Sequence, residues 1–442
     1  DSVAFVDATS LTFKLSATGV ALTSGQLANR PYTVKVTGGA GLTATSTATI
    51  GFSGLSWTSP AAGATLTFST ASSVTNTELA ATDDVGGTNR TFSVPASNLP
   101  SPLTLNGITG AITGTIGAAT AAGGVSVTFR VTDNVTGATL DRTFSIVGVA
   151  PLYSFSTHTF TNAGKTGRNG PTLTNLTDTY TPAWTDNPSH LNVTTQGIQE
   201  WTVPATGTYR ITAIGAKGGT GTGTALAAYE AGGKGAWMQG DFTLSTNETL
   251  HILVGHQGDS IGQAGMGGGG GGGTFVSKGT TLANSVALIV AGGGGGGSYS
   301  YTSSVIGNPG LATIGSNANA GAENPAKVGL AIQDYEGAGF TGNATSGGSN
   351  AAKAFKSGGV GGTGQDNGDP LEGGFGGGGG SSSSFPSGGG GGGYQGGAAG
   401  LNQWAQLGNG GGGLSYNQGA NSSGVSGSSL ANGNGSVIIL KL

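Results

Sequence analysis

The sequence contains no cysteine and very little charge. Without cysteine the chain forms no disulfide, no thiolate metal site and no cysteine nucleophile. Charged residues make up 8% of the 442 residues, against about 25% in an ordinary soluble domain. The net charge of −4 offers no basic surface for nucleic acid. No apolar run approaches the roughly 18 residues of a membrane span, so we expect neither nucleic-acid binding nor membrane insertion.

Glycine, in contrast, is present in large excess. Only 18 of the 92 glycines lie before residue 151, so 74 lie in the last 292 residues. This change in composition predicts a domain boundary near residue 150. After the boundary, short apolar segments alternate with five glycine runs, at 267–273, 292–297, 376–380, 388–393 and 410–413.

Residues 1–149 show the alternation of apolar and polar residues that is typical of half-buried strands. The alternation recurs at 11–15, 32–36, 125–131 and 143–147. Glycine, asparagine and proline separate these strands at short intervals, as in a β-sandwich. The first part of the chain is therefore predicted to be all-β.

Two resemblances divide this first part into modules. The segment 57–149 resembles the cadherin-like and Ig-like repeats of bacterial and phage surface proteins, on residues 99–115, 129–133 and 141–146. The segment 1–56 resembles the second half of an IPT/TIG-type Ig module, on residues 5–13, 32–37 and 41–45. Because the first half of that module is missing, we expect the natural protein to extend before Asp1. The alternative is a shortened module whose strands pair with a neighbouring chain.

The remainder, 150–442, resembles the glycine-rich domain of the anaplastic lymphoma and leukocyte receptor tyrosine kinases. Such domains also occur in bacterial and phage proteins. The matching residues are 160–172, 197–213, 232–236, 252–255, 267–276, 289–292 and 433–440. The chain departs from the receptors in having no cysteine and in a different insert between Ser298 and Phe375. The cytokine ligand of the receptors is therefore not carried over.

The glycine runs themselves have two interpretations. One is a flexible linker. The other is a bundle of polyglycine II helices with three residues per turn, in which every N–H and C=O bonds a neighbouring helix because none bonds within its own. The run 292–297 directly follows the apolar strand 286–290, which favours the bundle. The predicted fold class is all-β, with Ig-like β-sandwich modules followed by a glycine-rich β domain with packed polyglycine II helices.

Two short motifs resemble catalytic signatures, but the residues around them do not fit either signature. The stretch 163–166 reads Ala-Gly-Lys-Thr, but a phosphate loop needs a glycine at position 159, which is Thr159. The stretch 258–262 has the spacing of a hydrolase nucleophile elbow, which must feed a helix. Here the run 267–273 follows instead. We therefore expect no enzyme and no nucleotide cofactor.

The histidines and carboxylates are possible ligands for zinc or calcium. His251 and His256 lie at the two ends of one predicted strand and face opposite sides, so surface histidines are favoured over a zinc site. A calcium site is conceivable at one end of the second module, since carboxylate and amide oxygens gather there. Its candidate ligands are Asp83, Asp84, Asp133, Asn134 and Asp141. Solvated turn residues are the simpler interpretation, so no metal is predicted.

Aromatic residues are few, so their positions matter. Several lie in or beside the segments between glycine runs, where a stiff scaffold would present them to a partner. The candidate receptor contacts are Tyr299, Tyr301, Tyr335, Phe340, Tyr394 and Trp404. The alternative is that these side chains cap the helix bundle as a small apolar layer. Trp201 and Trp237, on predicted strands, are assigned to the core.

These features together predict a non-enzymatic structural protein of the virion surface. Its modules resemble those of tailed-phage proteins, cyanophages especially, and indicate a tail fibre or adhesin whose glycine-rich tip contacts the host through 298–375 and 381–407. The expected partners are a host receptor (glycan or outer-membrane protein), other virion proteins and further copies of the chain. Alternatives are a bacterial surface adhesin or extracellular structural protein, a capsid decoration or spacer, and a glycan-cleaving enzyme.

Overall fold

The computed structural model describes residues 2–7, 10–14, 35–37, 43–45, 55–70, 77–82, 89–117, 119–120, 123–134, 138–222, 229–260, 267–298, 311–314, 335–344, 351–364, 371–381, 387–400, 402–403, 406–428, 430–431 and 433–442. The chain forms two compact units. The first consists of Asp1–Thr67, Thr75–Gly114 and Thr120–Val147, and the second of Phe68–Val74, Thr115–Ala119 and Gly148–Leu442. The three-part division at residues 56 and 149 stays a prediction.

Residues 2–45 contribute two antiparallel ribbons. Their strands are β1 (Ser2–Asp7) with β2 (Ser10–Lys14), and β3 (Lys35–Thr37) with β4 (Thr43–Thr45). The predicted strand at 11–15 coincides with β2, and that at 32–36 overlaps β3 only at its end.

The segment 55–149 forms an Ig-like arrangement of short sheets. Its four-stranded sheet has the order β6 (Thr65–Ser69), β13 (Thr139–Val149), β12 (Val125–Asp133), β9 (Arg90–Ser93). A three-stranded sheet has the order β10 (Thr104–Leu105), β11 (Ala111–Thr113), β7 (Thr77–Glu78), and a two-stranded sheet pairs β5 (Ser56–Ser59) with β8 (Ala80–Thr82).

The core of this module follows the alternation seen in the sequence. Along β12, Val127, Phe129 and Val131 are buried, and the residues between them are at most half-buried. Trp57 packs on Phe144 with ring centroids 6.1 Å apart in an edge-to-face geometry, which favours aromatic pairs beyond their buried area. The predicted strands at 125–131 and 143–147 are confirmed.

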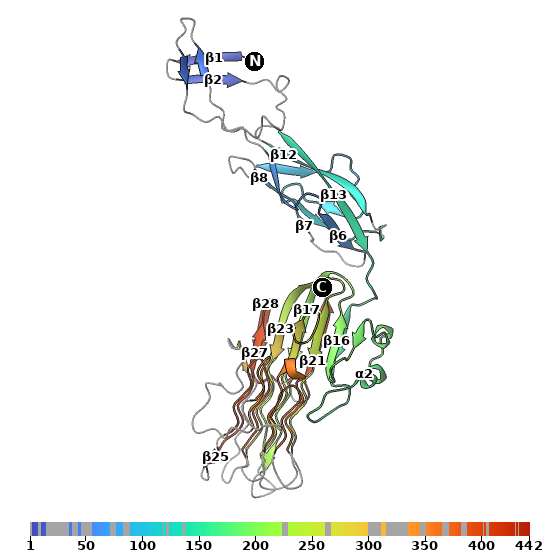
Figure 1. Ribbon diagram of the computed structural model, residues 1–442, viewed down its shortest axis with the longest axis vertical. Helices are drawn as coiled ribbons and strands as arrows, with labels where there is room; N and C mark the ends of the chain where they lie inside the picture. Colours follow the sequence, from blue (N-terminus) through green and yellow to red (C-terminus); the bar gives the residue numbers. More distant parts are fainter. Residues whose placement is uncertain are drawn as a thin grey trace. The chain divides into compact units, whose positions relative to one another are not determined.

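The second unit begins as a sandwich of two sheets (Figure 1). The five-stranded sheet has the order β14 (Thr157–Phe160), β29 (Ser436–Lys441), β17 (Gly207–Ile214), β20 (Trp237–Leu244), β28 (Ala420–Val425). The seven-stranded sheet has the order β15 (Leu191–Asn192), β16 (Ile198–Thr202), β21 (Thr249–Leu253), β22 (Thr274–Lys278), β23 (Val286–Ala291), β27 (Leu414–Asn417), β24 (Leu311–Ile314).

Shorter elements complete the unit. Two small ribbons pair β18 (Gly221–Thr222) with β19 (Tyr229–Glu230), and β25 (Asn402–Gln403) with β26 (Gln406–Leu407). The helix α2 (Leu173–Thr179) starts at the N-cap Thr172, whose hydroxyl accepts from the backbone of Asn175. The 3₁₀ turns are η1 (Ala183–Asp186) and η3 (Phe355–Ser357).

One apolar cluster fills the space between the two sheets. Alternate residues of β17 and β29, such as Ile211 and Ile439, meet Ile252 of the opposite sheet. Trp201 is fully buried there, as predicted. Trp237 is only half-buried, because on β20 the neighbouring Met238 occupies the core-facing position.

Beyond the sheets the chain continues as extended glycine stretches. Three of them lie at the centre and are called rod A (267–273), rod B (292–297) and rod C (388–393). Other extended stretches surround them, at 215–219, 232–236, 255–259, 335–339, 359–364, 372–380, 396–400 and 408–413. In Figure 1 the rods run side by side as the continuation of the strands.

Rod A shows how the rods are joined. Successive N–H groups point to three different neighbours, and the pattern repeats every three residues. Rod A donates to rod B from Gly268 and Gly271, to 255–259 from Gly269 and Gly272, and to 376–379 from Gly270 and Gly273, over 2.7 to 3.1 Å. A helix of three residues per turn gives this result, because its successive N–H groups point about 120° apart.

The carbonyl oxygens of rod A complete the array. They accept from rod C, from the stretch 215–219 and from Gly374. Rod A is therefore hydrogen-bonded to five neighbouring stretches of chain, one of which, 372–380, both donates to it and accepts from it. Rod C likewise donates to three stretches and accepts from three. Because the extended helix has no internal hydrogen bonds, these bonds between rods are what satisfies its buried backbone.

Rods A and B continue the register of the strands that adjoin them in the chain. Thr274 of β22 faces Ala291 of β23. Three residues further along, Gly271 donates to Gly294, and three further, Gly268 donates to Gly297. The strand-to-rod transition therefore requires no turn, and a core strand leads directly into six glycines.

Close approach explains why the rods contain glycine alone. At every glycine of rod A, a Cβ atom would lie less than 3.0 Å from backbone atoms of a neighbouring stretch. At Gly270 the obstructing atoms are the carbonyl oxygen and carbon of Gly390 in rod C. The outer stretches admit larger residues such as Lys217, Lys234 and Gln257 where one side faces away from the array. The predicted all-β fold class is confirmed.

The prediction for the insert at 298–375 requires a correction. It was expected to form loops that leave the scaffold, but its described parts are mostly built into the array. Gly337 donates to Gly397, and Gly374 donates to Gly270 of rod A. Gly361 donates to Arg168 beside the array, and the adjacent Gly362 donates to Gly378. Isolated glycines at these positions allow the same close approach as an unbroken run does.

We predict that Gly270→Ala destabilises the second unit. Its new Cβ meets backbone of rod C that cannot move without breaking further hydrogen bonds, so we expect a loss of about 3 kcal/mol or more in the free energy of unfolding, at or above the upper end of overpacking costs. The matched control is Gly433→Ala, where a Cβ meets nothing within 4 Å. Urea denaturation measures both. Equal stability of the two variants would contradict the array.

Candidate functional site

The end of the array remote from the sheets is the first candidate site. The hydrogen bonds from Gly268 to Gly297, from Gly389 to Gly268 and from Gly269 to Asp259 bring several chain ends together there. The described residues that border stretches outside the described part of the chain at this end are Thr222, Ser260, Gly267, Ser298, Ser381 and Ser387. These described residues therefore lie together at one end of the array.

Side-chain hydrogen bonds hold the chain in place where it leaves. The Asn409 side chain accepts from the backbone N–H of Ser298 over 2.7 Å. The Ser260 hydroxyl accepts from the backbone N–H of Thr220 over 2.8 Å. The Ser381 hydroxyl donates to the Ser387 carbonyl over 2.7 Å. The described residues at this end are therefore fixed relative to one another on a rigid scaffold.

The six predicted contact residues fall into three groups. Tyr299, Tyr301 and Trp404 lie outside the described residues. Tyr335 and Phe340 lie in the interior, each with 4% of its surface exposed. Burial leaves the side chains of these two residues without an exposed face for a receptor. Phe340 packs in an apolar layer, which is the other interpretation. Neither residue is carried forward as a contact.

Tyr394 is the one predicted contact residue that is described and partly exposed. It belongs to a row of stacked aromatic rings on the outer face of the seven-stranded sheet, where it lies between Phe340 and Tyr416. Its ring is 4.2 Å from that of Tyr416 with an interplanar angle of 14°. Burial raises the pKa of the Tyr394 hydroxyl, and the neighbouring Tyr416 contributes to the shift. The row covers the sheet rather than the end of the rods.

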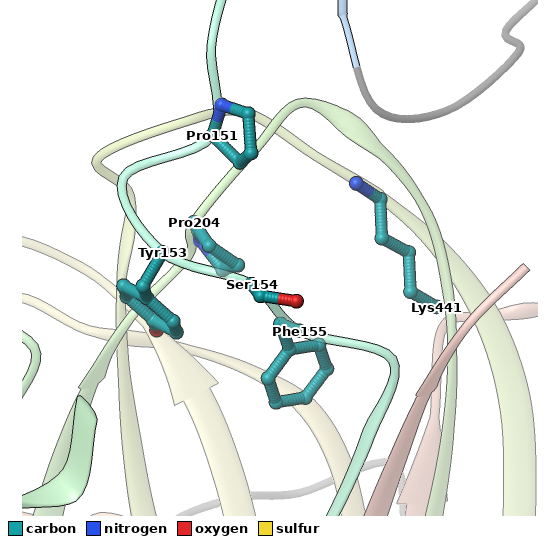
Figure 2. A pocket seen from close by; sticks show the side chains of 6 residues that line it. All are labelled: Pro151, Tyr153, Ser154, Phe155, Pro204 and Lys441. Atoms are coloured by element: carbon teal, nitrogen blue, oxygen red, sulfur yellow. The ribbon is translucent and has the colours of Figure 1, made fainter. Parts of the chain in front are cut away.

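A second candidate site lies at the opposite end of this unit, where the sandwich opens. A cavity of about 270 Å³ is lined by Pro151, Tyr153, Ser154, Phe155, Pro204 and Lys441 (Figure 2). A second cavity of about 460 Å³ shares the stretch 153–155 and extends along Ser156, Thr157, Pro182, Ala183 and Trp184. None of the residues that line these two cavities was predicted from the sequence to contact a ligand.

The aromatic wall of this second site is held by stacking. Tyr153 lies on Trp184 with centroids 5.1 Å apart and an interplanar angle of 17°. The Tyr153 hydroxyl donates to the Thr202 carbonyl, and burial raises its pKa above the ordinary range. Phe155 meets Trp184 edge to face at 5.9 Å and packs on buried Trp201 at 5.0 Å. The wall is therefore preorganised.

The histidines are placed differently from the prediction. His251 and His256 are buried, with 2% and 0% exposed, so their assignment to the surface was wrong. Nδ1 of His256 donates to the Gly167 carbonyl over 3.0 Å. Burial lowers the pKa of His256 and of His158 to about 4 each. Within the described residues, no three His, Asp or Glu side chains gather as metal ligands.

The calcium hypothesis is weakened where it can be examined. Asp141 is held by Arg130, whose Nε and Nη2 donate to the two carboxylate oxygens over 2.7 and 2.8 Å. This guanidinium lowers the pKa of Asp141 and occupies both oxygens. Asp133 is buried at 5% exposure. Asp83 and Asp84 lie outside the described residues.

Comparison with known proteins identifies the Ig-like module that follows residue 54. Residues 55–149 match a family described as "Putative Ig domain". A part of the chain is 36% identical over 114 residues to the leukocyte tyrosine kinase receptor of Mus musculus. This match covers 24% of the chain and only 12% of the receptor.

No helix among the described residues is both long enough and apolar enough to cross a membrane. The Ig-like domain, the all-β fold and the receptor similarity are those of a surface or adhesion-type structural protein.

We predict that the protein loses stability as the pH falls from 6.5 to 4. The unfolded chain takes up a proton at His256 near the ordinary pKa of 6.5, whereas the folded chain does so only near 4. Protons therefore favour the unfolded state in this window, at a cost on the order of 3 kcal/mol for such a shift. His256→Asn keeps a donor for Gly167 without titrating, so its urea midpoint should vary less with pH. A slope equal to that of the wild type would refute this assignment.

Proposed function

We propose that this chain is a non-enzymatic virion-surface protein, a phage tail fibre or adhesin that contacts the host with the loop end of its glycine-rich unit. The observation that carries the proposal is the convergence of several chain exits at one end of the rod array. Segments that start from fixed points on a stiff base lose less conformational freedom on binding than free loops do. Recognition by loops on a rigid scaffold is a general arrangement.

The remaining features support an adhesin in particular. An Ig-like module precedes the glycine-rich unit in the chain, and it serves as a spacer in this proposal. The low charge and the absence of a metal cluster among the described residues suit a passive contact surface. The partners proposed are a host receptor, either a glycan or an outer-membrane protein, together with other virion proteins and further copies of the chain.

A cell-attachment experiment tests the proposal. Whole chain carrying Tyr299→Ser, Tyr301→Ser and Trp404→Ser is compared with wild type for binding to host cells and for blocking infection. We expect binding to fall at least about tenfold, because aromatic anchors dominate interface energetics, with an unchanged thermal midpoint. The matched control is Ile108→Ser, which alters an apolar side chain that is 81% exposed in the Ig-like module.

Two outcomes would overturn the proposal. Unchanged attachment by the triple variant would favour a decoration or spacer protein without receptor binding. Sugar released from host polysaccharide by the wild-type chain would make it a glycan-cleaving enzyme.

A further inference from the structure

The cavity at the open end of the sandwich contains Lys441, which forms no ion pair with the part of the chain that the structure describes. On β29, Val437 and Ile439 point into the core, and Lys441 continues this inward alternation. In the sheet register Lys441 lies opposite Tyr209, which is fully buried. The aliphatic stem of the lysine therefore follows the core face, and its ammonium emerges where the sandwich opens (Figure 2).

No carboxylate of the described residues pairs with this charge. Among the described residues the ion pairs join Arg130 to Asp141, Arg210 to Asp241, Lys278 to Glu248 and His251 to Glu200, and none includes Lys441. Partial burial lowers the pKa of the Lys441 ammonium, with no opposing charge to raise it. A partly desolvated cation without a counter-charge is costly, and an anion bound in the cavity would remove that cost.

The rest of the lining combines flat apolar surfaces with hydroxyls. Figure 2 shows the Ser154 hydroxyl and the Lys441 ammonium on either side of the cavity, with the rings of Phe155 and Tyr153 along one wall. The adjoining cavity adds Trp184 and Thr157. The two cavities share their central residues, so an elongated ligand can lie across both, and their volumes are near the roughly 300–1,000 Å³ of small-molecule sites.

We propose that this cavity binds an acidic saccharide, with a sugar carboxylate on the Lys441 ammonium and the sugar rings against Phe155 and Trp184. The C–H face of a sugar packs on aromatic rings, and its hydroxyls match Ser154 and Thr157. This site lies at the end of the unit opposite to the chain exits, so it does not depend on the proposed function.

An acidic peptide fits the cavity less well. Binding of an extended peptide next to β14, the edge strand beside the cavity, would use backbone groups of that strand. The ring of His158 on β14 is already enclosed by Tyr180 and Trp184, at 4.6 and 5.0 Å. The N–H of Thr161, directly after β14, donates to the Tyr180 hydroxyl over 2.8 Å and is therefore not available to a peptide.

Calorimetric titration of the whole chain with trigalacturonic acid tests this site, with neutral galactotriose for comparison. We expect the acidic sugar to bind more tightly than the neutral one, and we expect its affinity to fall as the salt concentration rises. Lys441→Met keeps the stem and removes the charge, so it should weaken trigalacturonate binding by about tenfold or more and leave galactotriose unchanged. The control Lys165→Met removes the same charge from an exposed position and should have no effect.

A second variant separates the aromatic wall from the charge. Trp184→Leu should weaken the binding of both sugars. In this variant, trigalacturonate should also quench less of the tryptophan fluorescence than it does in the wild type. Three results would overturn the proposal: no binding of trigalacturonate by the wild type, equal loss in the Lys165→Met and Lys441→Met variants, or tighter Lys441-dependent binding of a triglutamate peptide than of the sugar. The last result would make the occupant an acidic peptide.

Discussion

The backbone hydrogen bond between neighbouring glycine rods is the interaction on which the second unit depends. Each rod has no bonds of its own, so its N–H and C=O groups are satisfied only if other rods lie close on every side. This proximity excludes a Cβ at the central positions, as the surroundings of Gly270 show. Ordering so much glycine costs more chain entropy than ordering any other residue, and the array offsets that cost through many bonds formed together.

The array also determines where recognition can take place. Because the rods continue the antiparallel register of the sheets, strands and rods form one continuous scaffold from the sandwich to the chain exits. The interior offers no room for a ligand, since its central positions are occupied by backbone. The two ends of this unit differ accordingly: the residues that border the segments outside the described part of the chain lie at one end, and the open sandwich with Lys441 lies at the other.

The sequence allowed the strands and the central rods to be predicted, because both have local signatures. Alternation marks β12, and the continuity from Val286 to Gly297 marks a strand that enters a rod. The outer stretch 335–339 was missed because its glycines are isolated, and their close approach to other stretches arises only in the assembled array. Tyr335 and Phe340 were consequently placed on the outside. For Lys441 the sequence carried a signal, the alternation after Val437 and Ile439. Its importance depends on the lack of an ion pair with any described carboxylate, which only the fold reveals.

Amide hydrogen exchange of the glycines in rods A, B and C tests the central claim most directly. If these N–H groups are bonded between rods, they should exchange as slowly as amides of β17 and β22 in the sandwich, because both open only when the unit unfolds. Exchange at the rate of an unstructured glycine linker, with the sandwich amides still protected, would contradict the array and would show that the glycine runs are flexible linkers.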